Sequence, residues 1–500
     1  MKFILFLSAF ISFSMCEHPK DSSSADFTES VTLDSSQLNQ AFDQFKEPAL
    51  YHRRFKHGTI DSLLQVHAQR QLLTITQIGQ SVQGRSINEV TYGHGDKKVM
   101  LWSQMHGDEP TATMALFDLF NFLEGEKDDF QEVRDLLKEK LSLHFIPMLN
   151  PDGAEIYNRR NAQQIDLNRD ARKRQTVEGK LLRARAEAVR PAYGFNLHDQ
   201  NIYYNVPGTK NPVTISLLAP AFNEAREVNE VRKGAMQIIV GMNNLLQQYI
   251  PDAVAKYDDT FSPRGFGDNF QILGASTVLI ESGGLKGDPE KQEIRHLNFA
   301  IILNALTQIA QGSYQRFDVK AYEDIPFNAS QLHDVVIRNV EIGSDSISLR
   351  TDVAIRRGEY TVGSDYFVRG RVEDLGDLED NFGYEEIDEE GLRLHVAQTA
   401  PQVLEQAGEL SLDHAYELLQ KGFMAIKVKQ VGADKASKLH SLPFVLFTQN
   451  QFYPTTQITL GGTANFFLAD ASGSIKYAIV NGYVIDLSKK EPGIWKNTIL

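Results

Sequence analysis

Three apolar segments of this sequence each lead into a residue that can hold a metal ion or move a proton. Residues 98–105 lead to His106, residues 192–197 lead to His198, and residues 275–280 lead to Glu281. Helical segments lie between them, and this alternation predicts an α/β fold with a mixed, mainly parallel sheet flanked by helices. Sites in open sheets form outside the carboxyl ends of the strands, so we expect the three residues to converge on one crevice.

Glu109 follows His106 by three residues, where the first of these strands turns into a helix. An imidazole and a carboxylate at this spacing form only a weak motif by themselves. Together with His198 they make a set of two imidazoles and one carboxylate, which suits catalytic zinc and leaves one position for water. Glu281 is then left as the base that takes a proton from this water and passes it to the leaving amine.

The overall composition limits the classes of function. A chain of 500 residues with 42% hydrophobic and 23% charged residues is typical of a soluble globular protein with two or three domains. The net charge of −14 disfavours polyanions, so nucleic acid is not expected as a partner.

The first residues are typical of an export signal. Lys2 precedes an apolar run, residues 3–15, that is too short to span a bilayer, so residues 1–16 are interpreted as a secretory signal peptide. Residues 17–45 are polar and serine-rich, and we expect a tether there. No later stretch is long enough to span a membrane, so no transmembrane helix is expected.

The only cysteine, Cys16, stands at the end of this run and has two interpretations. In the first, it is the acylated residue of a bacterial lipoprotein, which the polar tether would suit. In the second, Ser14 and Cys16 form a cleavage site and the product is freely soluble. Both predict an exported protein, either periplasmic or secreted, or anchored to a membrane by lipid.

Five short motifs occur in a fixed order. They are residues 78–85 (IGQSVQGR), 106–110 (HGDEP), 150–153 (NPDG), 166–169 (DLNR) and 280–284 (IESGG). In this order and spacing they resemble the zinc metallocarboxypeptidases of the carboxypeptidase A type. The resemblance covers about residues 46–312, which we therefore expect to form the catalytic domain.

The resemblance implies a role for each matching residue. It implies His106, Glu109 and His198 as zinc ligands and Glu281 as the general base. It also implies Arg159 as the arginine that polarises the scissile carbonyl and stabilises the oxyanion. Asn168 and Arg169 match the pair that receives the terminal carboxylate of the substrate, and a guanidinium suits that task because it can bind a carboxylate with two hydrogen bonds.

The substrate side of the site departs from the family pattern. Gly107 and Asp108 stand where pancreatic-type members often have a substrate-binding arginine. Tyr257 is the candidate for the tyrosine that closes over the substrate, with an ordinary packed aromatic as the alternative, and Tyr203 and Tyr204 are weaker candidates. Residues 258–269 would border the side-chain pocket, but their charges leave its preference open. These charges are Asp258, Asp259, Arg264 and Asp268.

After residue 312 the pattern changes to short β-rich segments, which predict an accessory domain over residues 313–500. Expected strands are 334–341, 347–354, 359–368 and 476–487, with one helix at 412–420. Residues 333–339 and 478–485 are similar to the split β-sandwich that flanks the barrel in amidohydrolases, but the metal-binding barrel itself has no room here. The acidic run 373–390 is interpreted as a solvated loop rather than a calcium site.

The leading hypothesis is a zinc metallocarboxypeptidase that hydrolyses the last bond of a peptide with a free C-terminal carboxylate. A second hypothesis keeps the zinc chemistry but takes cell-wall peptides or N-acyl amino acids. A third, an inactive binding scaffold, is disfavoured because the chain keeps every ligand, the base and the arginine.

Overall fold

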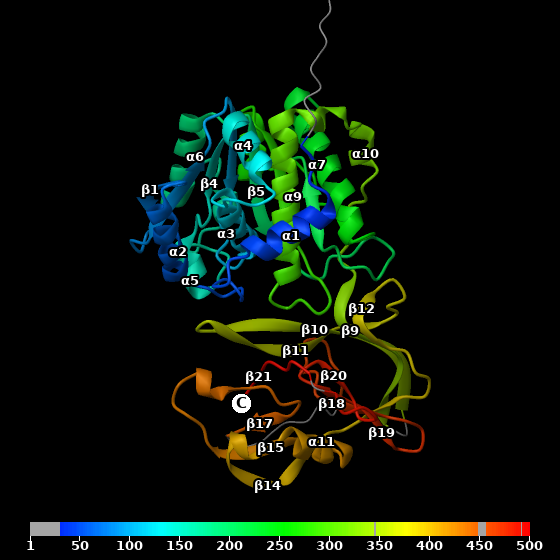
Figure 1. Cartoon of the computed structure of the whole chain (residues 1–500). Helices are drawn as coiled ribbons and strands as arrows, with labels where there is room; N and C mark the ends of the chain where they lie inside the picture. The colour runs from blue at the N-terminus through cyan, green and yellow to red at the C-terminus, as the bar shows by residue number, and fades with distance from the viewer. Residues whose placement is uncertain (1–30, 345–346, 449–456, 492) are drawn as a thin grey trace, which may run out of the picture. The chain divides into compact units, whose positions relative to one another are not determined.

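The computed structural model describes residues 31–344, 347–448, 457–491 and 493–500 (Figure 1). The predicted signal peptide (1–16), Cys16 and the tether as far as residue 30 lie outside the described residues. Residues 32–500 form one compact unit. No helix in the described part of the chain combines the length and apolar character needed to cross a membrane.

A mixed sheet of eight strands forms the centre of the α/β region, with the order β1-β2-β4-β3-β5-β8-β6-β7. Strands β4, β3, β5 and β8 are parallel neighbours, whereas β1, β2 and β6 join the sheet in antiparallel fashion. The mainly parallel α/β fold is therefore confirmed. The strands are β1 (Thr74–Gln80), β2 (Ser86–Tyr92), β3 (Lys97–Trp102), β4 (Leu141–Ile146), β5 (Tyr193–Asp199), β6 (Ile215–Leu218), β7 (Val254–Lys256) and β8 (Ser276–Ser282).

Helices cover both faces of this sheet (Figure 1). Helices α6 and α8 pack into a core cluster on one face, and α9 packs against α1, α3, α4 and α7 on the other. The central strands are thus buried from two sides, which explains their uninterrupted apolar sequences. The helices are α1 (Ser35–Phe45), α2 (His57–Arg70), α3 (Thr111–Leu123), α4 (Gln131–Lys140), α5 (Pro151–Ile156), α6 (Val177–Val189), α7 (Glu230–Tyr249), α8 (Phe266–Ile272), α9 (Gln292–Gln311) and α10 (Val319–Glu323).

Helix α1 lies within the segment 17–45 that was expected to be a tether, and that prediction is wrong for these residues. Asp34 caps the helix by accepting a hydrogen bond from the backbone N–H of Gln37 at 2.8 Å, and the Gln37 side chain accepts one in return. Apolar side chains at helical spacing form its buried face. They are Leu38, Ala41 and Phe42. With Phe45 they stand at helical spacing, a local signal that the tether interpretation overlooked.

The rest of the chain is β-rich, as expected, and the one α-helix among its described residues stands where it was predicted, α11 (Leu412–Gln420). The predicted strand 359–368 instead covers the end of β10, a turn at Gly363 and the start of β11. The predicted strand 476–487 is likewise two strands, β19 and β20, joined by a turn at residues 481–482. The domain boundary near residue 312 and the amidohydrolase similarity stay predictions. The strands are β9 (Leu332–Ser344), β10 (Ile347–Val362), β11 (Asp365–Gly376), β12 (Phe382–Ile387), β13 (Arg393–His395), β14 (Gln398–Gln406), β15 (Phe423–Gln430), β16 (Leu439–His440), β17 (Val445–Phe447), β18 (Phe466–Ala469), β19 (Ile475–Val480), β20 (Tyr483–Asp486) and β21 (Asn497–Thr498).

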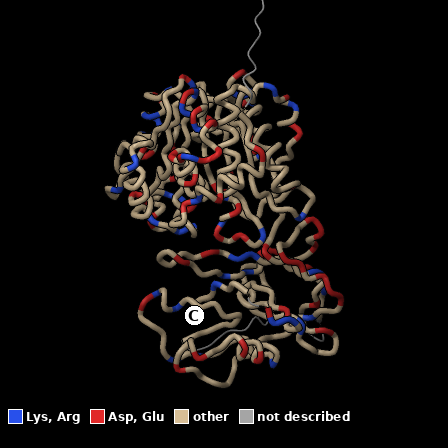
Figure 2. The backbone as a smooth tube through the Cα atoms, in the orientation of Figure 1, with Lys and Arg blue, Asp and Glu red and all other residues tan. Residues whose placement is uncertain are grey.

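The acidic run 373–390 is not a single loop, because β12 occupies its middle. In Figure 2 its acidic residues appear as red stretches of the tube near the place where Figure 1 labels β12. Strand β12 pairs with β9 in parallel, and two of its acids lie near arginines. Glu385 is 3.6 Å from Arg357 and Glu386 is 3.6 Å from Arg338. The loop interpretation is therefore wrong for Phe382–Ile387, and also for residues 373–376, which end β11.

The β-rich region contacts the segment before α2 and the loops that follow β5 and β8. Glu359 on β10 accepts hydrogen bonds from Arg53 at 2.9 Å and from Arg54 at 2.6 Å. The hydroxyl of Tyr384 on β12 donates to the carbonyl of Ile202 at 2.6 Å, and it occupies the place that a side chain on Gly284 would need.

Replacing Glu359 with glutamine is expected to lower the free energy of unfolding at pH 7 by about 1–2 kcal/mol, because its charged hydrogen bonds with Arg53 and Arg54 are lost. The expected loss is modest because solvent reaches the Glu359 side chain and weakens these bonds. Burial raises the pKa of Glu359, but Arg53 and Arg54 outweigh burial and lower that pKa. The lowered pKa means that this stabilisation is present above the unfolded-state pKa of about 4.3 and is lost as the pH falls below it.

Urea unfolding at pH 7 and pH 3.5 measures this effect. The difference between wild type and Glu359→Gln should shrink at the lower pH. The exposed Glu417 on α11 supplies the control, since Glu417→Gln should leave stability unchanged at both pH values. An equal loss at both pH values would contradict the assignment.

Candidate metal centre and substrate pocket

The predicted metal ligands come together at the carboxyl edge of the sheet. His106 follows β3, Glu109 precedes α3, and His198 lies near the end of β5. One ligand atom of each lies within 4.8 Å of the other two, and all three residues are buried. Glu109 lies between the imidazoles, with its oxygens 2.7 Å from Nδ1 of His106 and 2.6 Å from Nδ1 of His198. Two imidazole nitrogens and one carboxylate converging in this way fit zinc.

Asp166, the first residue of the motif 166–169, lies beside the metal-binding set, although no role was predicted for it. Its Oδ1 lies 3.0 Å from Nε2 of His106, on the side of the ring away from Glu109. A carboxylate in this position fixes the tautomer and orientation of a ligating histidine, so that Nδ1 is free for the metal. The place of this acid within the motif 166–169 could have suggested the contact from the sequence.

Protonation in the metal-free protein is set by these same contacts. Burial lowers the pKa of His106, but Glu109 and Asp166 outweigh it and raise that pKa to about 9. Burial is the main cause that lowers the pKa of His198. Burial opposes ionisation of Glu109, yet the two imidazoles hold the pKa of Glu109 well below its ordinary value. A charged Glu109 and a neutral His198 are the forms in which these groups bind metal, and metal would displace the His106 proton.

Glu281 lies at the end of β8, directly opposite His198 in the pairing of β8 with β5. This register explains how residues 83 positions apart reach the same site. Burial, with a further contribution from Glu109, raises the pKa of Glu281 well above its ordinary value. A carboxylate with a raised pKa is a stronger proton acceptor, which is the property that the predicted role requires.

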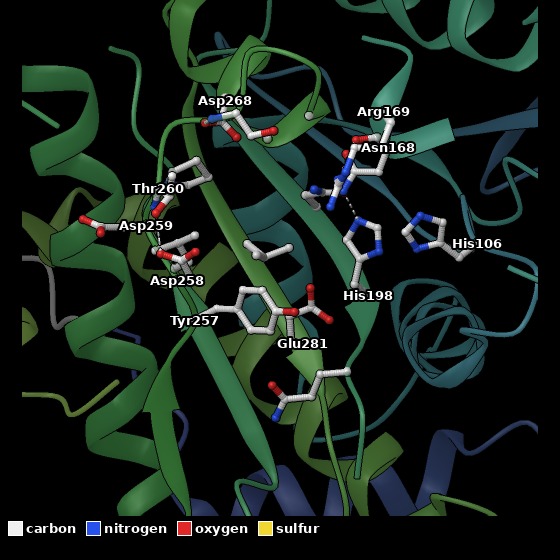
Figure 3. A pocket seen from close by; sticks show the side chains of 18 of the residues that line it. His106, Asn168, Arg169, His198, Tyr257, Asp258, Asp259, Thr260, Asp268 and Glu281 are labelled. Carbon is white, nitrogen blue, oxygen red and sulfur yellow. Dashed lines mark hydrogen bonds between the residues drawn. The ribbon is translucent and has the colours of Figure 1, made fainter. Parts of the chain in front are cut away.

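All eight predicted site residues line one cavity of about 430 Å³ (Figure 3). Arg159 lies beside the metal ligands, where Nη1 donates to Glu109 at 2.9 Å and the guanidinium also contacts Asp166 at 3.1 Å. Asn168 Nδ2 is 3.3 Å from Nε2 of His198. The eight residues are His106, Glu109, Arg159, Asn168, Arg169, His198, Tyr257 and Glu281.

The structure distinguishes among the tyrosine candidates. Tyr257 and Tyr204 both line the cavity and contact each other edge to face, with ring centroids 5.9 Å apart. Tyr203 lies outside this lining, because its hydroxyl donates to Asp334 of the β-rich region at 2.5 Å. Burial raises the pKa of Tyr257, so its hydroxyl stays protonated and able to donate a hydrogen bond.

Three of the four charged candidates for the side-chain pocket line the cavity, and all three are acids. Asp259 is paired with arginines, Arg226 at 2.8 Å and Arg232 at 3.1 Å. Asp258 and Asp268 also line the cavity, and neither forms an ion pair with another residue in the described part of the chain. Asp268 accepts a hydrogen bond from the backbone of Ser262 at 2.8 Å, and burial raises its pKa to about 6. Arg264, the fourth candidate, is exposed and lies outside the lining.

Comparison with known proteins agrees with this geometry. Residues 60–201 match the family model of zinc carboxypeptidases. Carboxypeptidase SOL1 of Arabidopsis thaliana is 42% identical over 67 residues, covering 13% of each chain. Carboxypeptidase E of Caenorhabditis elegans is 32% identical over 120 residues, covering 20% of this chain and 25% of the relative. The chain thus spans a quarter or less of the length of these two relatives.

Solved structures give more distant matches. A metallo-carboxypeptidase from Burkholderia cenocepacia is 18% identical, with a TM-score of 0.43 over 52% of this chain and 70% of the other. One from Pseudomonas aeruginosa is 16% identical, with a TM-score of 0.42 over the same shares. The family match includes His106, Glu109, Arg159 and His198 and ends before Glu281. Residues 60–201 of this chain thus match the zinc carboxypeptidase family.

Proposed function

We propose that this protein is a zinc-dependent carboxypeptidase that removes the last residue of a peptide. One observation carries the proposal: the metal-binding set and a receptor for a terminal carboxylate line the same cavity. His106, Glu109 and His198 would hold the zinc. Zinc bound there would polarise the scissile carbonyl and lower the pKa of a coordinated water.

Two residues beside the metal-binding set would have separate roles in the reaction, one in proton transfer and one in stabilising the oxyanion. Glu281 takes up a proton from the attacking water and returns it to the leaving amine. The guanidinium of Arg159 is fixed by Glu109 and Asp166 beside the place where the carbonyl oxygen gains charge. One such donor contributes about 3–4 kcal/mol to the transition state.

Arg169 and Asn168 would restrict cleavage to the C-terminal end of the substrate. The Arg169 guanidinium can bind a free carboxylate through two hydrogen bonds, and this contact requires the chain end of the substrate. Asn168 is held in place because its Oδ1 accepts a hydrogen bond from the backbone of Phe266 at 2.9 Å. A peptide without a free carboxylate would leave the charge of Arg169 unmatched.

A peptide library with free C-termini, paired with the same peptides amidated, tests the proposal. Mass spectrometry should show loss of single residues from free peptides and little change in amidated ones. Internal cleavage, or equal cleavage of both sets, would refute exopeptidase action. Including cell-wall peptides and N-acyl amino acids in the same assay separates the alternative substrate class.

The acidic lining supports a preference for lysine or arginine at the end of the substrate. Asp268 is expected to carry this preference, because Asp259 is already paired with Arg226 and Arg232. In Asp268→Asn, kcat/KM for peptides ending in arginine should fall by about 10- to 100-fold, since hydrogen bonds to charged groups contribute roughly 1.5–3 kcal/mol. Turnover of peptides ending in leucine should change little, and an equal loss for both would contradict the role.

We also propose that the protein is exported, supported by Lys2 and the apolar run 3–15. Cell fractionation should place it outside the cytoplasm. The mass of the mature N-terminus then separates acylated Cys16 from a free cleaved end. Full-length protein in the cytoplasm would refute export.

A further inference from the structure

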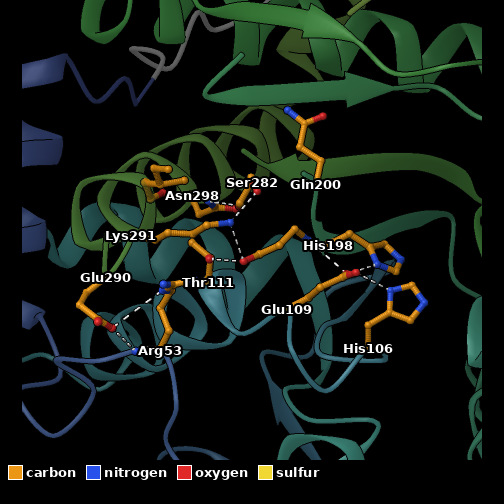
Figure 4. A network of polar contacts seen from close by, with 12 residues as sticks. Arg53, His106, Glu109, Thr111, His198, Gln200, Ser282, Glu290, Lys291 and Asn298 are labelled. Carbon is orange, nitrogen blue, oxygen red and sulfur yellow. Dashed lines mark hydrogen bonds and ion pairs between the residues drawn. The ribbon is translucent and has the colours of Figure 1, made fainter. Parts of the chain in front are cut away.

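Lys291 stands directly before α9, and its side chain turns inward behind the metal-binding set (Figure 4). The residue is only 6% exposed. Its Nζ donates to Oδ2 of Asp199 at 3.0 Å and to the carbonyl of Ser282 at 3.0 Å. Buried lysines are rare unless they are paired, and these two contacts account for the burial.

Both partners of Lys291 directly follow residues of the site. Asp199 follows the metal ligand His198 at the end of β5, and Ser282 follows the proposed base Glu281 at the end of β8. The two strands are parallel neighbours, and Asp199 is paired with Ser282 in their register. A single ammonium group therefore ties together the strand ends that carry a metal ligand and the base.

Asp199 extends this contact to Glu109. Its backbone N–H donates to Oε2 of Glu109 at 3.2 Å, and its carboxylate accepts a hydrogen bond from Thr111 at 2.6 Å. Thr111 is the first residue of α3, two positions after Glu109. Asp199 thus holds the start of α3 and the Glu109 carboxylate against β5.

The charges in this region explain why a cation is needed. Glu109 and Glu281 are buried, the side chain of Asp199 is 6% exposed, and the three carboxylates lie close enough to affect one another's charge. Without Lys291, the carboxylate of Asp199 would be left without its cationic partner and would turn toward other donors. The backbone of Lys291 has φ of 52°, a region that residues with side chains rarely adopt and that often occurs at functional sites.

We propose that Lys291 is a positioning residue of the metal centre, which sets the placement of His198, Glu109 and Glu281 through Asp199 and Ser282. Partners of this kind commonly change metal affinity or activity by about 10- to 100-fold when they are removed. The activity readout below rests on the proposed function, whereas the zinc-binding readout does not.

A second cavity offers a direct way to test this role. It has a volume of about 450 Å³, and Lys291 lines it together with the loop before α9 and residues of the β-rich region such as Arg357 and Tyr384. Shortening Lys291 to alanine would open a channel from this cavity toward Asp199. Propylammonium matches the atoms that this substitution removes and could occupy their place.

The experiment uses the full-length protein as wild type, Lys291→Ala, Lys291→Met and Asp199→Asn. Zinc affinity is measured by competition with a chelator, kcat and KM with a peptide substrate, and folding by circular dichroism. All three variants should bind zinc about 10- to 100-fold more weakly. At saturating zinc, kcat should fall while KM changes little, because the substrate contacts are intact.

Chemical rescue separates positioning from general stability. Propylammonium should restore zinc affinity and kcat in Lys291→Ala by tenfold or more, but not in Lys291→Met, whose side chain fills the space. Tetramethylammonium, which has the charge but no N–H donors, should not rescue. Lys286→Ala is the matched control, because Lys286 is exposed and lines the same cavity; it should behave as wild type.

Two results would overturn the proposal. One is wild-type zinc affinity and kcat in folded Lys291→Ala and Asp199→Asn. The other is lowered stability with no change in zinc binding or kcat, which would make Lys291 a purely structural residue. If the wild type binds zinc but cleaves no peptide, the proposed function fails, and the zinc affinities still decide the role of Lys291.

Discussion

Replacing Glu281 with glutamine is expected to lower kcat by about 10²- to 10⁴-fold, the usual contribution of a general base. Glutamine keeps the size of the side chain but cannot accept the proton. Glu281 is not one of the three residues that would hold zinc, so the metal should remain bound. Steady-state kinetics with a peptide substrate and metal analysis of the same preparation measure both parts of the prediction.

Glu293→Gln serves as the control for Glu281→Gln. Glu293 is an exposed residue of α9, far from the cavity lining, and its substitution should leave kcat unchanged. Full activity in Glu281→Gln would remove this residue from the mechanism. Loss of zinc together with activity would instead make Glu281 part of the metal site.

Removing the metal is expected to abolish peptide hydrolysis, with a fall of at least about 10³-fold, because zinc supplies several kcal/mol of transition-state stabilisation. A chelator should inactivate the wild type, and added zinc should restore it. His198→Ala should lose both zinc and activity, and added zinc should not restore this variant at concentrations that restore the wild type.

His395→Ala provides the comparison for His198→Ala. His395 is an exposed histidine on β13 and lies outside the cavity, so its substitution should change neither zinc content nor rate. Chelator-resistant hydrolysis by the wild type, or normal zinc content in His198→Ala, would refute the assignment of the metal-binding set.

The fold class and the main site residues were accessible from the sequence for a physical reason. Strands buried on both faces must be apolar along their whole length, so the polar residues at their ends stand out. His106 follows β3, and His198 and Glu281 lie near the ends of β5 and β8. Parallel pairing brings the carboxyl ends to one edge, which is why the site could be predicted before the structure was known.

Other features could not be predicted because their meaning depends on partners distant in sequence. In the sequence, Lys291 cannot be told from an ordinary loop lysine. Its partner Asp199 is 92 positions away, so only the structure shows their contact. Asp166 acts on His106 from 60 positions away. Helix α1, by contrast, had a local signal that was overlooked, because its apolar residues stand at helical spacing.

The contact between Tyr384 and Gly284 constrains how this chain can vary. Any side chain at position 284, three residues after Glu281, would collide with the Tyr384 hydroxyl. A larger residue there therefore requires the Tyr384 side chain to move aside or to be replaced by a smaller one. A graft of the β-rich region onto another carboxypeptidase is thus expected to pack best where the recipient also has glycine at this point.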